Sequence, residues 1–196
     1  MGGTPNHPRE RYTATLLSTL GKRPRILELG CGAGIPITRM LLDQGTSVTA
    51  NDISTEQLEL AKERCPAATS LAGDMLAMDL PLGSFDGVVS FFAIFHLPRD
   101  EQRAMFDKIY DWLADGGAFT FNVATTDAAE IKSDFLGMVM FWSSFGTQEN
   151  EAMIRDAGFR ILQVEVLEAG DGKLAAEDPD HATTFQWVLA EKTERT

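Results

Sequence analysis

Apolar runs of strand length alternate with amphipathic stretches along most of this chain. In the stretches between the runs, apolar residues recur at the three- and four-residue spacing of a helix face, as in Tyr12, Leu16 and Leu20. This alternation predicts a doubly wound parallel sheet with right-handed crossovers and helices on both faces. The expected strands cover 26–29, 48–52, 67–72, 85–92 and 118–123, and two more close the chain at 159–167 and 183–190.

Start and stop signals support the helices of this pattern. Pro36 stands in the first turn of a helix that ends before Gly45. Ser54 and Gln57 form a capping box for the next helix. The helix that begins at Pro98 carries a core-facing stripe and is closed by a glycine pair. The stripe consists of Met105, Phe106, Ile109, Trp112 and Leu113, and the pair is Gly116 and Gly117.

Residues 124–146 interrupt this rhythm. Their first half is polar, and their second half is rich in aromatic residues and methionine with no clean period. The segment is compatible with a short core helix or with a lid over a ligand, and we favour the lid because so much apolar surface is concentrated there. A helix over 147–157 follows, and an acidic stretch over 168–181 is expected to be a surface loop between the last two strands.

Length and composition limit the possible classes of protein. A chain of 196 residues with 44% hydrophobic content can bury one sizeable core, so we expect a single domain over 9–196 after a flexible leader at 1–8. The formal net charge of −12 disfavours nucleic acid and anionic membranes as partners. We expect a monomer, although nothing in the sequence sets the oligomeric state.

Neither metal chemistry nor a membrane segment is indicated. Cys31 and Cys65 show no metal-ligand spacing, and the three histidines do not cluster. The longest apolar run, 85–97, is too short to span a bilayer, and the N-terminus lacks a secretory signal pattern. We therefore expect a soluble cytoplasmic protein without a metal.

The candidate chemistry begins with the glycine turn after the first strand. Gly30, Gly32 and Gly34 follow an apolar strand and open a helix, so a ligand can approach the backbone where no Cβ intervenes. The dinucleotide-binding spacing Gly-x-Gly-x-x-Gly requires glycine at position 35, which is Ile35 here. Glu28 lies two residues before the turn, where a carboxylate would repel a pyrophosphate and attract a cationic ligand.

The run Glu28-x-Gly30-x-Gly32-x-Gly34 resembles motif I of the class I S-adenosylmethionine (SAM) dependent methyltransferases. Asp52 and Asp74, each at the end of a later strand, match two further motifs of that family. The resemblance implies a Rossmann-like sheet of seven strands, mostly parallel with a C-terminal antiparallel strand, and SAM as cofactor. It places these residues at the cofactor: Glu28, Gly30, Cys31, Gly32, Gly34, Asp52, Ile53, Gln57, Asp74, Met75, Ser90 and Phe91.

Two of the carboxylates have specific expected roles. Asp52 lies 22 residues after Gly30, where a carboxylate can accept hydrogen bonds from both ribose hydroxyls, and the alternative is that it caps the following helix. By resemblance, Asp74 accepts a hydrogen bond from the adenine amine, and Met75 covers the ring; taken alone, Asp74 could equally be a turn residue.

The predicted activity is transfer of a methyl group from SAM to a nitrogen, oxygen or carbon of a small-molecule acceptor. The acceptor site is expected at Tyr12, His96, Met138, Phe141, Trp142 and Phe145. His96 follows the fourth strand and is a candidate general base, because histidine exchanges protons near neutral pH. It could instead position its loop or line the methionine end of the cofactor.

Other functions remain open at this stage. A protein or RNA methyltransferase would share every cofactor motif, although the acidic charge and the hydrophobic lid count against it. A nicotinamide oxidoreductase is disfavoured by the glycine spacing and by Glu28. A noncatalytic SAM-binding partner subunit would carry the same pocket.

Overall fold

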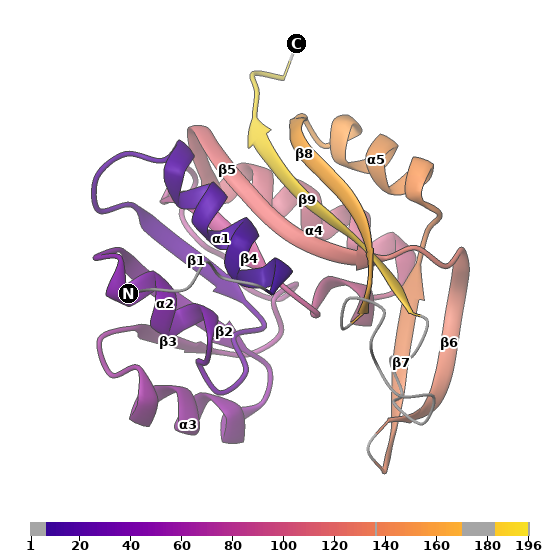
Figure 1. The fold of residues 1–196 in the computed structure, drawn as a ribbon, viewed down its shortest axis with the longest axis horizontal. Coiled ribbons are helices and arrows are strands. Elements are labelled where there is room, and N and C mark those ends of the chain that lie inside the picture. The colour runs from indigo at the N-terminus through magenta and orange to yellow at the C-terminus, as the bar shows by residue number, and fades with distance from the viewer. Residues whose placement is uncertain (1–6, 136, 170–182, 196) are drawn as a thin grey trace.

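The computed structural model describes residues 7–135, 137–169 and 183–195. Within them, seven strands form one sheet in the order β3-β2-β1-β4-β5-β9-β8, with helices packed on it (Figure 1). The first five strands in this order are parallel, and β9 is antiparallel to both β5 and β8. This confirms the fold class predicted from the sequence. The strands are β1 (Arg25–Leu29), β2 (Ser47–Asp52), β3 (Thr69–Ala72), β4 (Phe85–Ser90), β5 (Leu113–Ala124), β8 (Phe159–Glu168) and β9 (Thr184–Lys192).

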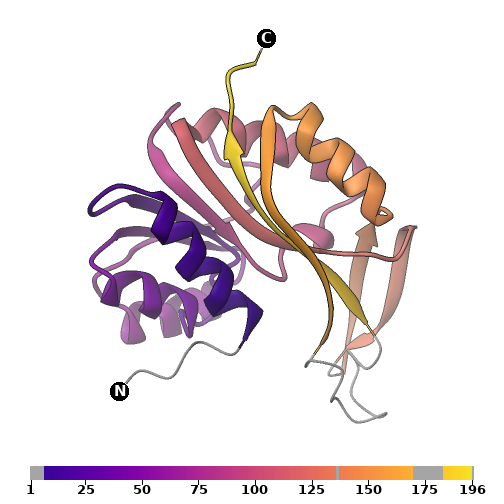
Figure 2. The same ribbon diagram turned by 45° about the horizontal axis from the view of Figure 1, so that its top comes forward.

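The helices cover both faces of the sheet (Figure 2). They are α1 (Pro8–Thr19), α2 (Ile37–Asp43), α3 (Thr55–Arg64), α4 (Arg99–Trp112) and α5 (Thr147–Asp156), with a short 3-10 helix, η1, at Ile94–His96. Residues of α1, α2 and α3 share one buried apolar cluster, and residues of α4 and α5 share the other. The sheet is therefore sandwiched between two cores, as expected for strands that are apolar on both sides.

Helix boundaries follow the expected chemistry. The Ser54 hydroxyl accepts a hydrogen bond from the Gln57 backbone N–H at 3.3 Å and caps α3. Helix α2 begins at Ile37, so Pro36 is its N-cap residue and not, as expected, a residue of its first turn. The predicted stripe of α4 is buried, and each of its large side chains contributes roughly 1.5–3 kcal/mol through burial. Helix α4 is thus fixed to the sheet, directly after the short helix that carries His96.

The segment at 124–146 forms a β-hairpin, so the alternative of a short core helix is wrong. Its strands, β6 (Ala128–Phe135) and β7 (Met138–Ser144), pair with each other in a two-stranded sheet that is separate from the main sheet. The turn is closed by Asp134, whose carboxylate accepts from the Gly137 N–H at 3.0 Å. Exposure falls along β7 from 66% at Met138 to 1% at Ser144. The hairpin therefore projects from the sheet edge with a buried foot (Figure 1).

Helix α4 holds the foot of the hairpin. The fully buried Gln102 donates through Nε2 to the carbonyls of Leu97 and Ser143, both at 2.8 Å. Arg99 donates from Nε to the Ser144 carbonyl at 3.0 Å and forms an ion pair with Asp127. These contacts fix the hairpin and the loop that carries His96 to the same helix.

The ends of two predicted segments are set differently by the structure. Helix α1 begins at Pro8, the last residue of the predicted leader, and residues 1–6 lie outside the described residues. The expected acidic loop at 168–181 lies almost wholly outside them as well, since the description stops at 169 and resumes at 183. In the described part of the chain, no helix has the length and apolar character needed to cross a membrane.

Candidate functional site

The glycine turn lies at the carboxyl ends of the parallel strands, where ligands bind in open sheets of this kind (Figure 1). The backbone N–H groups of Gly30 and Cys31 both donate to the Asn51 carbonyl at 2.9 Å. This pair of hydrogen bonds holds the turn after β1 against the end of β2. The Cys31 side chain is buried, and its thiol donates to the Gly32 carbonyl at 3.4 Å.

The three glycines of the turn are needed for different reasons. All three have positive φ, but a Cβ on Gly30 would approach the Cβ of Ala93 to 2.5 Å, and one on Gly34 would press on Ala61 at 3.2 Å. At Gly32 the nearest atom to an added Cβ would be Oε1 of Gln57, 3.9 Å away. Gly30 and Gly34 therefore permit close packing within the protein, and Gly32 borders open space where a ligand can approach.

This difference predicts separate outcomes for two alanine variants. Gly30→Ala should lower the free energy of unfolding by about 2–4 kcal/mol, because it combines backbone strain with a clash. Gly32→Ala should cost about 1–2 kcal/mol from its left-handed backbone alone, but should weaken binding of S-adenosylhomocysteine (SAH), the demethylated form of SAM, by tenfold or more. Urea unfolding and calorimetry measure the two quantities. Equal stability of the two variants would contradict this assignment.

Glu28 is a buried acid beneath the turn. Its side chain is 5% exposed and accepts one hydrogen bond, from the Thr38 hydroxyl at 2.6 Å. Burial raises the pKa of Glu28 to about 7; the Thr38 hydrogen bond opposes this shift, Asp52 adds to it and Arg9 opposes it. A carboxylate held this way is costly in the free protein, and a cation brought by a ligand would stabilise it.

Asp52 joins the turn to the start of α3. One carboxylate oxygen accepts from the Gly32 N–H at 2.8 Å, and the other accepts from the Ser54 N–H at 2.9 Å. The capping alternative is therefore partly correct, since Asp52 bonds the residue that caps α3. Each oxygen keeps a second lone pair, so the carboxylate can also accept hydroxyl groups of a ligand. The neighbouring Ile53 is 74% exposed and offers an apolar surface beside it.

Asp74 lies at the end of the adjacent strand. The Gly73 N–H donates to the Asp52 carbonyl at 3.1 Å, which places the 73–75 turn next to the end of β2. The exposed Asp74 accepts from the Leu76 N–H at 2.9 Å, and Met75 is partly buried beside it. Gln57, also exposed, faces Gly32 from α3. The predicted acids thus come together along one edge of the sheet.

Four further predicted contact residues, Tyr12, Ser90, Phe91 and Phe145, have side chains that pack within the protein. Tyr12 is fully buried and donates its hydroxyl to the Trp187 carbonyl at 3.2 Å. Ser90 is fully buried and donates to the Leu29 carbonyl at 3.3 Å. Phe91 packs against Trp187, and Phe145 lies beneath the guanidinium groups of α4. Core packing uses these side chains, and their predicted contacts with a ligand stay predictions.

The remaining acceptor residues lie where η1 meets the hairpin. The Nδ1 atom of His96 is 2.9 Å from the Phe141 carbonyl, and its ring centroid is 6.0 Å from that of Trp142. A carbonyl oxygen only accepts hydrogen bonds, so Nδ1 carries the proton and Nε2 is the basic nitrogen of the neutral ring. Met138 stands apart at the exposed end of β7.

Two residues near the site were missed by the sequence reasoning. Phe92 has φ of +56°, and its N–H donates to the buried Asn122 side chain at 2.7 Å. This geometry turns the Phe92 ring onto Phe185 and Trp187, at centroid distances of 5.1 and 5.7 Å. In the sequence, the signal for this geometry is Asn122, a polar residue inside an otherwise apolar strand. The second residue is Arg9, whose guanidinium lies 5.5 Å from the centroid of the Phe92 ring.

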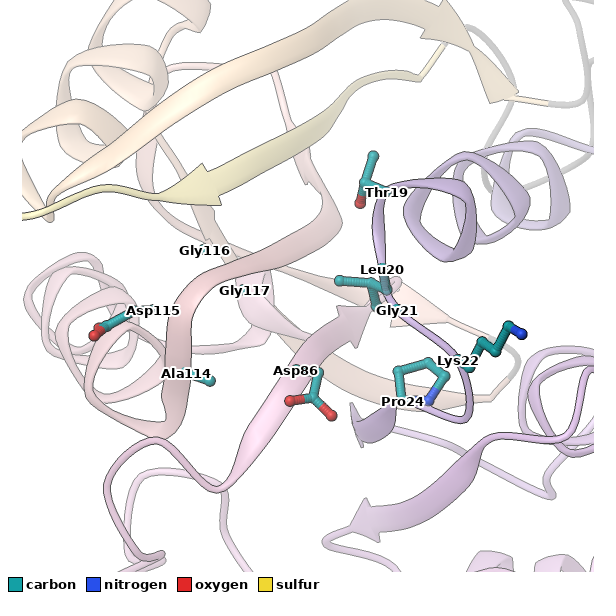
Figure 3. Close-up of a pocket in the computed structure, with 10 residues that line it drawn as sticks. All are labelled: Thr19, Leu20, Gly21, Lys22, Pro24, Asp86, Ala114, Asp115, Gly116 and Gly117. Atoms are coloured by element: carbon teal, nitrogen blue, oxygen red, sulfur yellow. The ribbon is translucent and has the colours of Figure 1, made fainter.

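A separate cavity of about 320 Å³ lies at the opposite edge of the sheet (Figure 3). It is bordered by Lys22, Asp86 and Asp115 and by the glycines that begin β5. Asp86 is already paired with Arg25 at 2.7 Å, and the residues that line this cavity include no histidine or cysteine. We therefore place the functional site at the carboxyl edge. No cluster of three metal-binding side chains occurs in the described ranges.

Comparison with known proteins agrees with this geometry. Residues 26–117 match the model of a methyltransferase domain family. An uncharacterized methyltransferase from Oceanobacillus iheyensis is 29% identical over 126 residues, which cover 64% of this chain and 59% of that protein. The chain thus spans less than two thirds of this relative's length.

Solved structures share the fold over nearly the whole chain. A SAM-dependent methyltransferase from Mesorhizobium loti has a TM-score of 0.74 at 21% identity, covering 97% of this chain and 100% of that one. The Burkholderia thailandensis 1,6-didemethyltoxoflavin-N1-methyltransferase has a TM-score of 0.73 at 22% identity, covering 97% and 80%. The chain is thus similar to methyltransferases over residues 26–117 and shares the fold of SAM-dependent methyltransferases over nearly its whole length. SAM, the cofactor predicted from the sequence, is the one named for the similar structure from Mesorhizobium loti.

Proposed function

We propose that the protein transfers the methyl group of SAM to a small-molecule acceptor. The observation that carries this proposal is the alignment of Glu28, Gly32, Asp52 and Asp74 along the carboxyl edge, with open space at Gly32. The residues present fit the cofactor chemically. Asp52 would accept from the ribose hydroxyls, Asp74 from the adenine amine, and Glu28 would stabilise the cationic methionine end.

The bound cofactor supplies a sulfonium-activated methyl group, which passes to the acceptor's lone pair and leaves SAH. The protein's contribution is to hold the acceptor in line with the methyl, an effect worth roughly 7–11 kcal/mol in favourable cases. A hydroxyl or ammonium acceptor must also lose a proton. Nε2 of His96 is the nitrogen able to take it, since Nδ1 donates to Phe141.

The small-molecule acceptor is proposed from the acceptor side of the site. His96 and Trp142, with ring centroids 6.0 Å apart, form an aromatic wall beside the hairpin that suits an apolar or planar body, and the Phe141 carbonyl holds the His96 ring in place. The Burkholderia protein, as its name states, methylates N1 of 1,6-didemethyltoxoflavin. The net charge of −12 disfavours RNA or DNA as the acceptor. We also propose a cytoplasmic location, from the same sequence features as above.

The proposal is tested in two steps. Calorimetry should show binding of SAM and SAH and none of NAD. Incubation with a panel of small-molecule phenols, amines and carboxylic acids should then release SAH. SAM binding without SAH release for any small molecule, followed by SAH release when protein or RNA is added, would contradict the small-molecule acceptor. The acceptor would then be a protein or an RNA. A failure to bind SAH would refute the cofactor site itself.

Trp142→Ala should lower turnover of an identified acceptor by about tenfold or more, with SAH affinity within twofold of wild type. The reason is that Trp142 packs beside His96 at the proposed acceptor wall, with their ring centroids 6.0 Å apart. Val139→Ala, at the 76% exposed end of the same strand, is the matched control. Equal losses in turnover, SAH affinity and thermal stability would show that Trp142 stabilises the fold and has no specific role at the acceptor.

A further inference from the structure

Arg9 lies on α1 at the mouth of the site. Its guanidinium stacks over the face of Phe92, 5.5 Å from the ring centroid, and its Nε donates to Nδ1 of His7 at 3.4 Å. The side chain is partly buried, and this burial lowers the pKa of Arg9, while Glu10 and Glu28 oppose the shift. The protein therefore holds a cation in a partly dehydrated position.

This cation differs from the other partly buried arginines. Arg11 is bonded to Glu165 through two hydrogen bonds of 2.9 and 2.8 Å, and Arg99 is paired with Asp127. Within the described ranges, no carboxylate lies within 4.0 Å of Arg9. A partly buried charge without an ionic partner is costly, and an anion brought by a ligand would offset that cost.

The surroundings of Arg9 indicate which part of the site this anion would occupy. The Phe92 ring lies against Phe95 at 6.3 Å, and Phe95 lies against His96 at 5.0 Å, so Arg9 stands at one end of a chain of rings that reaches the acceptor wall. Glu28 accepts from Thr38 and faces the cofactor side.

We propose that Arg9 binds the carboxylate of the methyl acceptor, so that the acceptor is an acid with an apolar or aromatic body packed on Phe92. This inference rests on the proposed function and narrows its substrate class. The guanidinium donates two hydrogen bonds to the carboxylate, and no covalent step involves Arg9. The planar fork of Arg9 matches a carboxylate, and the Phe92 ring beside it favours an acid with a flat apolar body over a neutral amide.

The probe is 1-naphthoate, compared with 1-naphthamide, which has nearly the same shape and no charge. Their affinities are measured by calorimetry, with tryptophan emission as a second readout, in the presence and in the absence of saturating SAH. Wild type should bind the acid at least about tenfold more tightly than the amide, the effect of a charge-assisted hydrogen-bond pair at a partly exposed site. Arg9→Gln should abolish this preference, and Arg9→Lys should retain part of it.

The control variant is Arg23→Gln, which removes one positive charge from an exposed position before β1 and should leave the preference unchanged. An acid preference that survives in Arg9→Gln, or is missing in wild type, overturns the proposal. A loss of SAH affinity in Arg9→Gln that is absent for decarboxylated SAH also overturns it, because Arg9 would then serve the cofactor's own carboxylate. Binding of SAH to wild type is measured separately, so failure of the cofactor site is distinguished from failure of the acid subsite.

Discussion

The Glu28→Gln variant will be more stable than wild type at pH 8 and will bind SAM more weakly. Burial raises the pKa of Glu28 from its ordinary value of 4.5 to about 7 in the folded protein. An acid whose pKa is raised by folding binds more protons in the folded state between these two values. Wild-type stability therefore falls as pH rises from about 4.5 to 7 and is lowest above 7.

A shift of this size corresponds to roughly 3 kcal/mol of unfolding free energy at pH 8. Glutamine keeps an acceptor for the Thr38 hydroxyl and has no charge to bury, so its advantage should be small at pH 5 and grow to the full difference by pH 8. Urea titrations across this range measure the difference. Glu59→Gln, on the exposed face of α3, is the matched control. Parallel pH profiles for wild type and Glu28→Gln would contradict the buried-acid assignment.

The same substitution should weaken SAM binding by about tenfold or more at pH 8, because the cationic methionine end loses its counter-charge. In wild type, SAM affinity should decline as pH falls below 7, where Glu28 becomes protonated. Calorimetry at pH 6 and 8 measures both effects. A variant that gains stability and loses cofactor affinity together would identify Glu28 as a group retained for binding at the expense of stability.

Removing the Asp52 carboxylate should produce the second large effect, a loss of SAH affinity of about 10- to 100-fold in Asp52→Ala. The carboxylate accepts hydrogen bonds from the N–H groups of Gly32 and Ser54, so its loss removes the bond that holds the glycine turn. It also removes the proposed acceptor of the ribose hydroxyl groups. Asp52→Asn keeps one acceptor oxygen and should lie between alanine and wild type. Asp79→Ala, at an exposed position, serves as control. Wild-type SAH affinity in Asp52→Ala would show that the ribose is held elsewhere.

The sheet and its helices could be predicted because each strand and helix has its own side-chain period and end signals. The hairpin could not, because β6 and β7 are held by pairing with each other, and their mixture of polar and aromatic residues has no period of its own. Its position was predicted from the break in the pattern, but its structure was not. Whether it acts as a lid remains a prediction.

Site residues were predictable where the backbone sets their position. The glycine turn and the acid at the end of β2 follow from spacing, and the structure brings them together. The direction of a side chain depends on packing between distant segments, so the burial of Tyr12 against Trp187 could not be foreseen. The left-handed conformation of Phe92 depends in the same way on Asn122, 30 residues further along the chain.

The separate pairing of β6 with β7 has an evolutionary consequence. In the described part of the chain, the ladder partners of these two strands lie within the hairpin, so exchanging it for a hairpin of another length or sequence would leave the strand pairing of the seven-stranded sheet intact. The matched family domain, residues 26–117, ends before this insertion. The hairpin can therefore vary in evolution while the glycine turn stays unchanged. Exchange of this one segment would alter the acceptor specificity and leave the strand pairing of the main sheet as it is.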